Sequence, residues 1–249
     1  GDDSKHGIED INMSKGIYII GTDTDVGKTV VSAGIMYLLL AKGYNACYFK
    51  PISSGGSETD EGFSSFDVSF VKAASGFCEP YARINPFRYK TPVSPHLASR
   101  IEGLYLDKRI IFNCYKQLIE KYEYIVAEGC GGLAVPLSQE GYMQYQLIKE
   151  LDTRCILVSR TTIGTINHTL LSISFAEKVG IQIVGIIFSG FCGSIVEQNN
   201  IDTIKMLSEV PVLGVIPSIQ GIDVERGVIG ELREVFNSEI NIECMVANV

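Results

Sequence analysis

The residues most suited to chemistry form one short segment near the start of the chain. Residues 21–29 read Gly-Thr-Asp-Thr-Asp-Val-Gly-Lys-Thr, after an apolar run at 17–20 and ahead of a helical pattern at 30–41. A strand, a glycine-bounded loop and Gly-Lys-Thr opening a helix are typical of a phosphate-binding P-loop. Backbone amides would converge on phosphate oxygens, while Lys28 adds positive charge and the Thr29 hydroxyl can ligate Mg²⁺.

The same segment leaves an alternative open. Five residues separate its two glycines, rather than the four of the plain motif. Asp23 and Asp25 would repel phosphate unless their carboxylates point away or serve a cation or an amine. The competing interpretation is a glycine turn that joins a strand to a helix and binds nothing.

Two further charged residues stand where predicted strands end. Lys50 follows the strand at 46–49, which Pro51 ends because proline cannot continue a central ladder. Glu128 follows the strand at 124–127 and precedes Gly-Cys-Gly-Gly. Open α/β sheets bind ligands at the carboxyl ends of their strands, and an acid there holds Mg²⁺ in P-loop proteins. The alternatives are a solvated strand end for Lys50 and a surface acid with a flexible turn for Glu128.

Asp67 has two interpretations. It opens a short helical pattern at 68–74, where an acid commonly serves as a helix cap. The other interpretation is a cation ligand that faces the P-loop, and on the sequence alone the cap leads. The preceding residues, 55–65, are mostly polar and small, which predicts a mobile loop.

These residues must be positioned by alternating strands and helices. We predict strands at 17–20, 46–49, 124–127, 155–158, 183–188 and 212–216. We predict helices at 31–40, 68–74, 104–121, 142–151, 166–179, 196–210 and 228–236, and an apolar tail at 240–249 that packs on the body. Nearly continuous apolar strands separated by helices predict a mostly parallel sheet covered on both faces. The predicted fold class is therefore three-layer α/β, similar to the P-loop NTPases.

Composition bounds the functional classes. The 249 residues carry a net charge of −8, which gives nucleic-acid binding no electrostatic support. No apolar run approaches membrane-spanning length. The seven cysteines are scattered without a Cys-x-x-Cys pair, which predicts reduced thiols in a cytosolic protein and no zinc site. His6, His96 and His168 stand apart, so the sequence suggests no histidine metal cluster.

The first twelve residues are mostly polar and do not begin with Met. We predict that residues 1–12 are an expression remnant or a disordered tail and that Met13 is the natural start. Residues 13–249 are predicted to form a single domain, because no linker or internal repeat divides them. Mass spectrometry of the protein from its native source would test the start.

Taken in order, the motifs resemble those of the dethiobiotin synthetase family over about residues 15–217. The matching segments are 21–29, 50–55, Asp67, 94–96, 128–132 and 164–168. The long P-loop with Thr-Asp-Thr is itself a habit of that family. The resemblance implies a homodimer that uses ATP and Mg²⁺ to close a cyclic urea. In that reaction 7,8-diaminopelargonic acid captures CO₂ as a carbamate, whose oxygen attacks the γ-phosphate. The second amine then traps the mixed anhydride and gives dethiobiotin.

The resemblance also implies roles for individual residues. Lys28 and Lys50 would be catalytic and flank the carbamate and γ-phosphate, and the metal ligands would be Thr29, Asp67 and Glu128. The nucleotide would be bound by Asp25, Val26, Gly27, Lys28, Thr29, Val30, Asp67, Glu128, Gly129, Cys130, Gly131, Ser189, Pro217, Ser218 and Ile219. The substrate would be bound by Thr24, Ser54, Gly164, Thr165 and Asn167.

The last three of these substrate residues open a predicted helix. Its N-terminal amides would bind the carboxylate tail of the substrate at the dimer interface. One departure from the family leaves the base preference open. Ser189 and Gly190 stand where many relatives carry an Asn-Asp pair that reads adenine.

Two rival classes share a P-loop of this kind. A ligase like the ATP-binding half of a cobyrinic acid diamide synthase would need a glutaminase domain, which we do not expect in this chain. A ParA/MinD-like switch ATPase would bind a partner or a membrane. Its P-loop usually carries an extra lysine near the first glycine, where this chain has Thr22 and Asp23. No C-terminal basic amphipathic helix is apparent in the sequence either.

Overall fold

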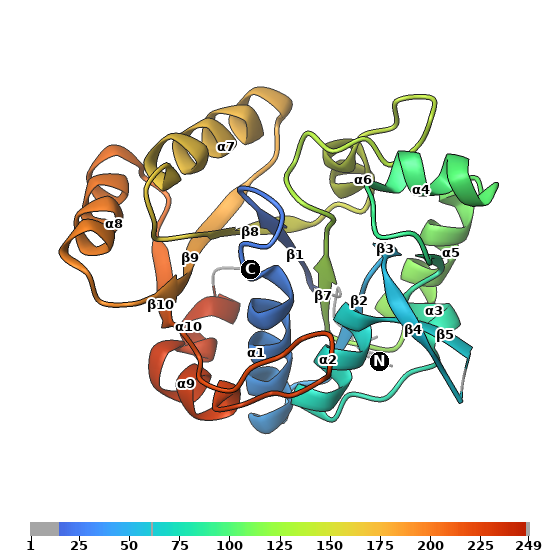
Figure 1. Cartoon of the computed structure of the whole chain (residues 1–249), viewed down its shortest axis with the longest axis horizontal. Coiled ribbons are helices and arrows are strands. Elements are labelled where there is room, and N and C mark those ends of the chain that lie inside the picture. The colour runs from blue at the N-terminus through green and yellow to red at the C-terminus, as the bar shows by residue number, and fades with distance from the viewer. Residues whose placement is uncertain (1–14, 61, 248–249) are drawn as a thin grey trace, which may run out of the picture.

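The computed structural model describes residues 15–60 and 62–247. The predictions for residues 1–12 and Met13, and for the last two residues of the tail, lie outside the described residues. At the centre is a six-stranded sheet in the order β10-β9-β8-β1-β7-β2 (Figure 1). All of its neighbouring strands run parallel. The predicted three-layer α/β fold is therefore confirmed.

The six strands of this sheet are apolar segments that fill the core. They are β1 (Lys15–Gly21), β2 (Ala46–Phe49), β7 (Tyr124–Glu128), β8 (Arg154–Ser159), β9 (Ile183–Phe191) and β10 (Val212–Pro217). The side chains of Ile17 to Ile20 are almost completely buried whichever face they point to. Burial on both faces is expected where helices cover a parallel sheet, and it explains why these strands are continuously apolar.

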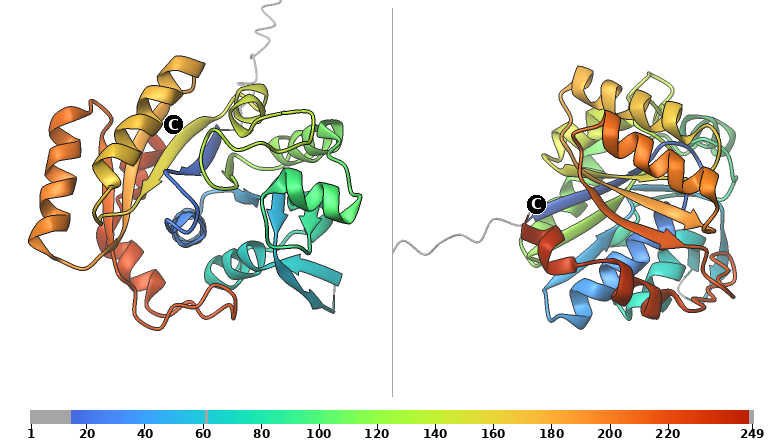
Figure 2. Two further views of the ribbon diagram at one scale, coloured as in Figure 1. Left: turned by 45° about the horizontal axis from the view of Figure 1, so that its top comes forward. Right: turned by 90° about the vertical axis from the view of Figure 1, so that its left-hand side faces the viewer.

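Helices cover both faces (Figures 1 and 2). On one face α1 packs against α2, α9 and α10, and on the other α7 packs against α8. The helices are α1 (Lys28–Ala41), α2 (Phe66–Ser75), α3 (Tyr81–Ile84), α4 (Pro95–Glu102), α5 (Lys108–Ile119), α6 (Gln144–Glu150), α7 (Thr165–Val179), α8 (Ile195–Leu207), α9 (Leu232–Glu239) and α10 (Ile242–Ala247). The predicted packing of the tail is confirmed for its described part, since Ile240, Met245 and Val246 are buried.

Two helices begin four residues later than predicted, because the residues before them make other contacts. The helix predicted from residue 104 starts at Lys108, where the Asp107 carboxylate accepts the amide of Arg109 at 3.0 Å. The helix predicted from residue 228 starts at Leu232. Asp223 and Val228 instead exchange two backbone hydrogen bonds of 2.8 Å, which hold that segment in a tight loop.

The prediction of a mobile loop at 55–65 is wrong. The segment forms an antiparallel hairpin of β4 (Gly56–Thr59) and β5 (Gly62–Ser65). The Arg88 guanidinium donates to the Phe63 carbonyl at 3.0 Å, and Lys90 pairs with Glu58 at 2.8 Å. Arg88 lies on β6 (Phe87–Tyr89) and Lys90 directly follows it, and β6 pairs with β3 (Ile52–Ser54). A polar segment is thus ordered by partners that lie far along the chain.

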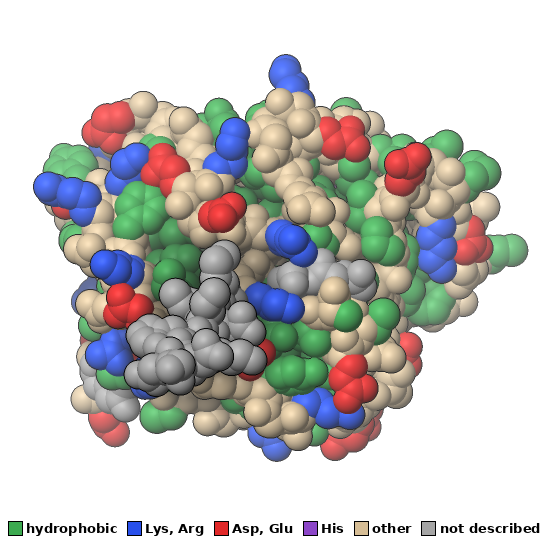
Figure 3. Space-filling view, turned by 180° about the vertical axis from the view of Figure 1, so that it is seen from behind, with side chains coloured by type: hydrophobic (Ala, Val, Ile, Leu, Met, Phe, Trp, Pro, Cys, Tyr) green, Lys and Arg blue, Asp and Glu red, His purple; other side chains and the backbone are tan. Residues whose placement is uncertain are grey.

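Charge on the face seen from behind is mixed. Lys and Arg side chains alternate there with Asp and Glu side chains, without an extended basic area (Figure 3). No helix in the described part of the chain has the length and apolar character needed to span a bilayer.

Candidate nucleotide and metal site

The P-loop connects β1 to α1 at the carboxyl edge of the sheet. The Gly21 amide donates to the Gly131 carbonyl at 3.1 Å, so the glycine loop after β7 lies directly beside it. Gly27 immediately precedes α1 with φ of +98°, a left-handed conformation that favours glycine. A Cβ on Gly27 would also collide with the hydroxyl of Ser189 on β9. The loop is therefore in contact with neighbours on both of its flanks.

The Lys28 ammonium is held close to this loop. It donates to the Asp23 carbonyl at 3.0 Å, and the side chain is largely buried. Burial lowers the pKa of Lys28, and the nearby positive charge of Lys50 lowers it further. The Asp23 carboxylate is exposed and accepts the amide of Thr24 at 2.7 Å. This acid therefore points to solvent, as a phosphate-binding loop requires.

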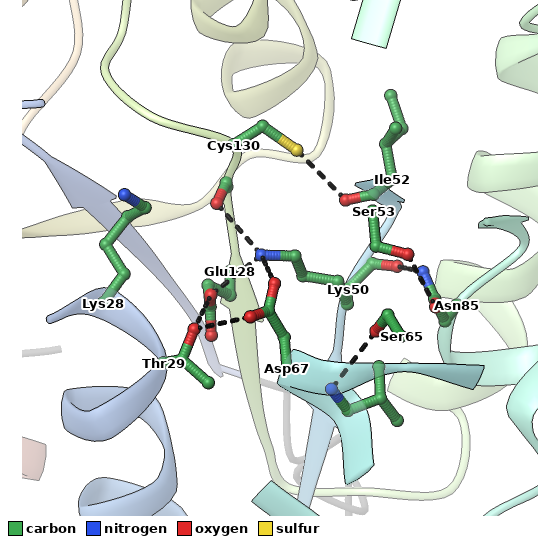
Figure 4. A network of polar contacts seen from close by, with 12 residues as sticks. Lys28, Thr29, Lys50, Ile52, Ser53, Ser65, Asp67, Asn85, Glu128 and Cys130 are labelled. Atoms are coloured by element: carbon green, nitrogen blue, oxygen red, sulfur yellow. Dashed lines mark hydrogen bonds and ion pairs between the residues drawn. The ribbon is translucent and has the colours of Figure 1, made fainter. Parts of the chain in front are cut away.

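Next to the P-loop, four side chains from four segments meet in one cluster (Figure 4). The Lys50 ammonium lies 2.7 Å from Asp67 Oδ2 and 2.8 Å from Glu128 Oε1. The Thr29 hydroxyl lies 2.9 Å from Asp67 Oδ1 and 2.9 Å from Glu128 Oε1. Residues that are distant in the sequence thus share their polar contacts, and Lys50 and Glu128 reach the cluster from the strand ends where the sequence analysis placed them.

Strand register explains half of this cluster. β2 pairs with β7 so that Phe49 lies opposite Ala127, which places Lys50 next to Glu128 at the ends of these strands. The Glu128 side chain is only 1% exposed and that of Lys50 only 4%. Neither residue is a solvated strand end, so that alternative is wrong for both.

The cap interpretation of Asp67 is wrong. Ser65 caps α2, because its hydroxyl accepts the Val68 amide at 3.2 Å. Asp67 lies two residues further on, in the first turn of α2, and its carboxylate points toward Thr29 and Lys50 instead. The sequence alone does not show which of the two residues is the cap, because Ser65 and Asp67 are both residue types that commonly cap helices.

The charges in the cluster stabilise one another. Burial alone would lower the pKa of Lys50, but the carboxylates of Asp67 and Glu128 outweigh it and raise this pKa well above its usual value. Burial would raise the pKa of Asp67, but the Lys50 ammonium and the hydrogen bond from Thr29 lower it. At neutral pH the site therefore holds a charged lysine beside an ionised Asp67.

The loop after Glu128 is fixed by a residue that sequence reasoning missed. The Gln144 side chain, 1% exposed, accepts the Cys130 amide at 2.6 Å and donates to the Gly132 carbonyl at 2.6 Å. The Cys130 thiol also donates to the Ile52 carbonyl at 3.1 Å. A buried glutamine in the first turn of α6 carries no local signal of such a contact, because its partners lie in an irregular loop.

A second missed residue is Tyr48. Its hydroxyl donates to Glu128 Oε2 at 2.8 Å. A signal was available here, since side chains two apart on a strand point to the same face. Tyr48 lies two residues before Lys50 on β2 and therefore shares its face.

The residues predicted to bind the nucleotide base lie at the ends of β9 and β10, on the side of β1 opposite to β2 and Lys50. β9 and β10 end side by side, with Pro217 paired to Phe191, and the Ser218 amide donates to the Phe191 carbonyl at 2.9 Å. Ser189 lies on β9 against Gly27, and Ile219 follows Ser218. These residues therefore border the P-loop on the side opposite Lys50.

The predicted substrate residues fall into two groups. Ser54 ends β3 and is partly buried. Gly164 precedes α7 with φ of +96°, and Asn167 is exposed in the first turn of that helix. The Thr165 hydroxyl donates inward to the Arg160 carbonyl at 2.6 Å, while the Arg160 guanidinium donates to the carbonyl of Thr24 at 2.8 Å. The start of α7 is thereby tied to the P-loop.

The donor set of the cluster fits Mg²⁺. Mg²⁺ prefers oxygen ligands and is usually held by one or two carboxylates together with substrate phosphates. Thr29, Asp67 and Glu128 supply a hydroxyl and two carboxylates, each with an oxygen 2.9 Å from the hydroxyl. The described residues contain no group of three or more His, Cys, Asp or Glu that could cage a metal. Phosphate oxygens and water are the ligands that would complete the coordination of Mg²⁺ at such a site.

Comparisons of the fold agree with this geometry. A putative plasmid partition protein from Borrelia burgdorferi, solved with AMPPNP, superposes with a TM-score of 0.60 at 15% identity over 95% of this chain and 100% of that chain. MinD in the MinC–MinD complex of Aquifex aeolicus gives 0.59 at 13% identity over 90% and 93%. At such identities the likeness concerns the fold alone. A family model described as an AAA domain matches residues 15–226. Fold and site together define a P-loop nucleotide-binding protein.

Curated sequences identify the family within this class. The ATP-dependent dethiobiotin synthetase of Clostridium kluyveri is 43% identical over 211 residues, which cover 84% of this chain and 88% of that protein. Those of Clostridium novyi and Caldicellulosiruptor saccharolyticus are 41% and 42% identical, over 84% and 82% of this chain and 89% and 86% of theirs. The chain belongs to the ATP-dependent dethiobiotin synthetase family.

Proposed function

We propose that this protein is a ligase of biotin synthesis that makes dethiobiotin from 7,8-diaminopelargonic acid, CO₂ and ATP. Relatives that are about two-fifths identical over most of the chain are named ATP-dependent dethiobiotin synthetases. The observation that carries the proposal is a second buried lysine, Lys50, set against two acids beside the P-loop. Nucleotide binding needs only the P-loop lysine, whereas a carbamate and a triphosphate are both anionic and need additional positive charge between them.

The residues divide the work as follows. The amides of the P-loop and Lys28 would bind the phosphates, and Lys50 would bind the carbamate and stabilise charge as its oxygen attacks the γ-phosphate. Thr29, Asp67 and Glu128 would hold Mg²⁺, which supplies neutralisation of charge on the phosphates. With Mg²⁺ held by these two acids, the Lys50 ammonium would be available to contact substrate. Positioning and electrostatic stabilisation would favour attack of the carbamate oxygen on the γ-phosphate, which forms the mixed anhydride and releases ADP. Attack of the second amine on the carbamate carbon would then close the ring and release phosphate.

The substrate and base sites follow from the same arrangement. Ser54 would contact the diamine end, and Thr24 lies on the P-loop between that end and α7. The first turn of α7, with Gly164, Thr165 and Asn167, would receive the carboxylate tail through its amides. The base would lie against the ends of β9 and β10. Because Ser189 offers a hydroxyl in place of a longer amide side chain, we expect the choice of base to be weak.

We further propose that the active form is a cytoplasmic homodimer in which residues 13–249 work as one domain. A reducing compartment agrees with the free thiols of Cys47, Cys78, Cys114, Cys130, Cys155 and Cys192. The exposed apolar side chains of Ile163 and Leu171 flank the first turn of α7 and would be covered by a second copy. Light scattering would measure the mass in solution, and a monomeric active enzyme would refute the dimer.

A coupled assay tests the function. Release of ADP should require both the diamine and bicarbonate, and mass spectrometry should find dethiobiotin as the product. A panel of nucleoside triphosphates would measure base preference in the same assay. ATP hydrolysis that ignores both substrates but rises with lipid vesicles or DNA would instead support a ParA/MinD-like switch. The likeness to MinD and partition proteins concerns the fold and does not favour that alternative.

A further inference from the structure

Tyr48 is a fully buried tyrosine at the centre of the site that none of the roles above uses. It lies on β2, and register with β7 places it opposite Val126. Side chains alternate along a strand, so Tyr48, Val126 and Glu128 all point to one face of the sheet. The hydroxyl of Tyr48 reaches diagonally across to Glu128 Oε2 at 2.8 Å.

The two oxygens of Glu128 therefore have different partners. Oε2 accepts the phenol, whereas Oε1 accepts the Thr29 hydroxyl at 2.9 Å and the Lys50 ammonium at 2.8 Å. The terminal torsion of a glutamate is broad and does not by itself choose an orientation. A donor fixed by the sheet chooses one, because rotation of the carboxylate would break the phenol bond in a buried setting.

The phenol is suited to act as a permanent donor. A tyrosine hydroxyl carries its proton at neutral pH and can therefore donate to the carboxylate. The Tyr48 side chain is fully buried on a strand of the sheet, so the oxygen has little freedom to leave Glu128.

We propose that Tyr48 is a positioning residue of the nucleotide–metal site, which holds Glu128 so that Oε1 faces Thr29 and the cation. The inference rests on the metal site of the proposed function. In it Tyr48 acts only through Glu128 and does not contact substrate. Partners that orient a metal ligand in this way commonly contribute about 10-fold or more to metal affinity.

Tyr48→Phe removes only the hydroxyl and keeps the ring. Calorimetric binding of ADP at increasing Mg²⁺ would give the half-saturating Mg²⁺ concentration without any turnover. We expect it to rise about 10-fold in Tyr48→Phe, with binding of ADP in the absence of Mg²⁺ unchanged. Tyr89→Phe is the matched control, since it removes a buried phenol bond of 3.1 Å to the carbonyl of Leu104, away from the acids. It should cost stability but leave the Mg²⁺ dependence as in the wild type.

A double-mutant cycle shows whether Tyr48 acts through Glu128. In a Glu128→Gln background, Tyr48→Phe should change the half-saturating Mg²⁺ concentration by less than about twofold, because the carboxylate it positions is gone. Wild-type ADP binding that ignores Mg²⁺ would refute the metal site itself. A Mg²⁺-dependent wild type with an unchanged Tyr48→Phe variant, or an equal shift in Tyr89→Phe, would refute the role of Tyr48 alone. Thermal unfolding of both variants measures any shared loss of stability.

Discussion

Lys50 balances the charge of two acids in this structure and is also the residue that we propose binds the carbamate. Its ammonium is bonded to Asp67 at 2.7 Å and to Glu128 at 2.8 Å, where one cation balances two buried acids. The same two carboxylates are those that fit Mg²⁺. A cation of either kind must therefore accompany the acids, since carboxylates left unpaired in a buried site carry a large desolvation cost.

Replacement of Lys50 by glutamine should remove most turnover but not nucleotide binding. The variant loses positive charge at the carbamate, while the P-loop amides and Lys28 remain. We expect kcat to fall about 10²- to 10³-fold, the usual effect of removing one group that stabilises transition-state charge. The coupled assay and binding of a fluorescent ADP analogue would separate the two effects. Lys90→Gln is the control, because Lys90 is an exposed lysine also paired with an acid; a fully active Lys50→Gln variant would exclude the proposed role.

At this scale the sequence predicted the residues whose position follows from a strand. Lys50 and Glu128 follow apolar strands, and the carboxyl ends of parallel strands meet at one edge. For Asp67 the sequence alone favoured the cap, which is wrong, because Ser65 and Asp67 both stand at the start of α2 and only tertiary contacts distinguish the cap from the ligand. Whether these residues bind as proposed stays a prediction.

At the scale of elements, α6 holds the glycine loop that follows Glu128. The Gln144 side chain accepts one backbone amide of this loop and donates to one of its carbonyls. The Gly129 carbonyl in turn accepts the Lys50 ammonium at 3.3 Å. Small residues allow the loop to pass close to a ligand, but they do not fix its path, so the glutamine has to.

Gln144→Leu should loosen this loop. It leaves the partly buried Cys130 amide and Gly132 carbonyl without the partners they have now, which costs up to about 1–3 kcal/mol of stability. We expect kcat/KM to fall about 10-fold as Glu128 and Gly129 lose their fixed positions. Denaturant unfolding and the coupled assay would measure both. Gln146→Leu is a matched control on the same helix, because its amide oxygen accepts only the Met143 amide at 2.8 Å among the bonds described. Equal loss of activity in both variants would show that α6 matters only for stability.

The start of α8 offers a test by pH. The Glu197 carboxylate accepts hydrogen bonds from the hydroxyls of Thr161 at 2.6 Å and Ser194 at 2.8 Å, which lower the pKa of Glu197 to about 2. An unfolded glutamate titrates near about 4.3. The folded state therefore gains stability from this carboxylate above about pH 4.3 and loses it as the pH falls toward about 2.

Glu197→Gln should accordingly be less stable than the wild type at neutral pH, by an amount that narrows in acid. Urea unfolding between about pH 7 and pH 3 would measure the difference in midpoint. The exposed Glu120→Gln variant is the control and should show no such narrowing. A constant difference across this range would mean that Glu197 stabilises α8 by packing and not by its charge.

Elements differed in how far sequence could define them. The strands of the sheet were predicted because their apolar runs are local signals. The prediction that they form a mostly parallel sheet was confirmed. The hairpin of β4 and β5 was missed, because residues 56–65 have no apolar alternation and are ordered by Arg88 and Lys90. α9 was placed too early because Val228, an apolar residue, belongs to a backbone-bonded loop.

At the scale of the whole molecule, the C-terminal part supports the helix on which the P-loop depends. α1 packs on the sheet, with α9 and α10 along one of its flanks and α2 along the other (Figure 1). A Cβ on Gly34, in the middle of α1, would overlap the fully buried ring of Phe236 on α9. Glycine is needed here for close approach, although it normally weakens a helix interior.

This contact predicts that one substitution changes sign with its background. Alone, Gly34→Ala should destabilise the protein by about 1–3 kcal/mol, because the added methyl overpacks against Phe236. Phe236→Ala should cost about 3–5 kcal/mol through the cavity it leaves. In that cavity the Gly34→Ala methyl has room, so its helix propensity should show as a gain of up to about 1 kcal/mol. Chemical unfolding of the four proteins in this cycle would measure the coupling. If the effects simply add, α9 does not hold α1 through this contact, and the support of the P-loop helix by the C-terminal segment must come from other residues.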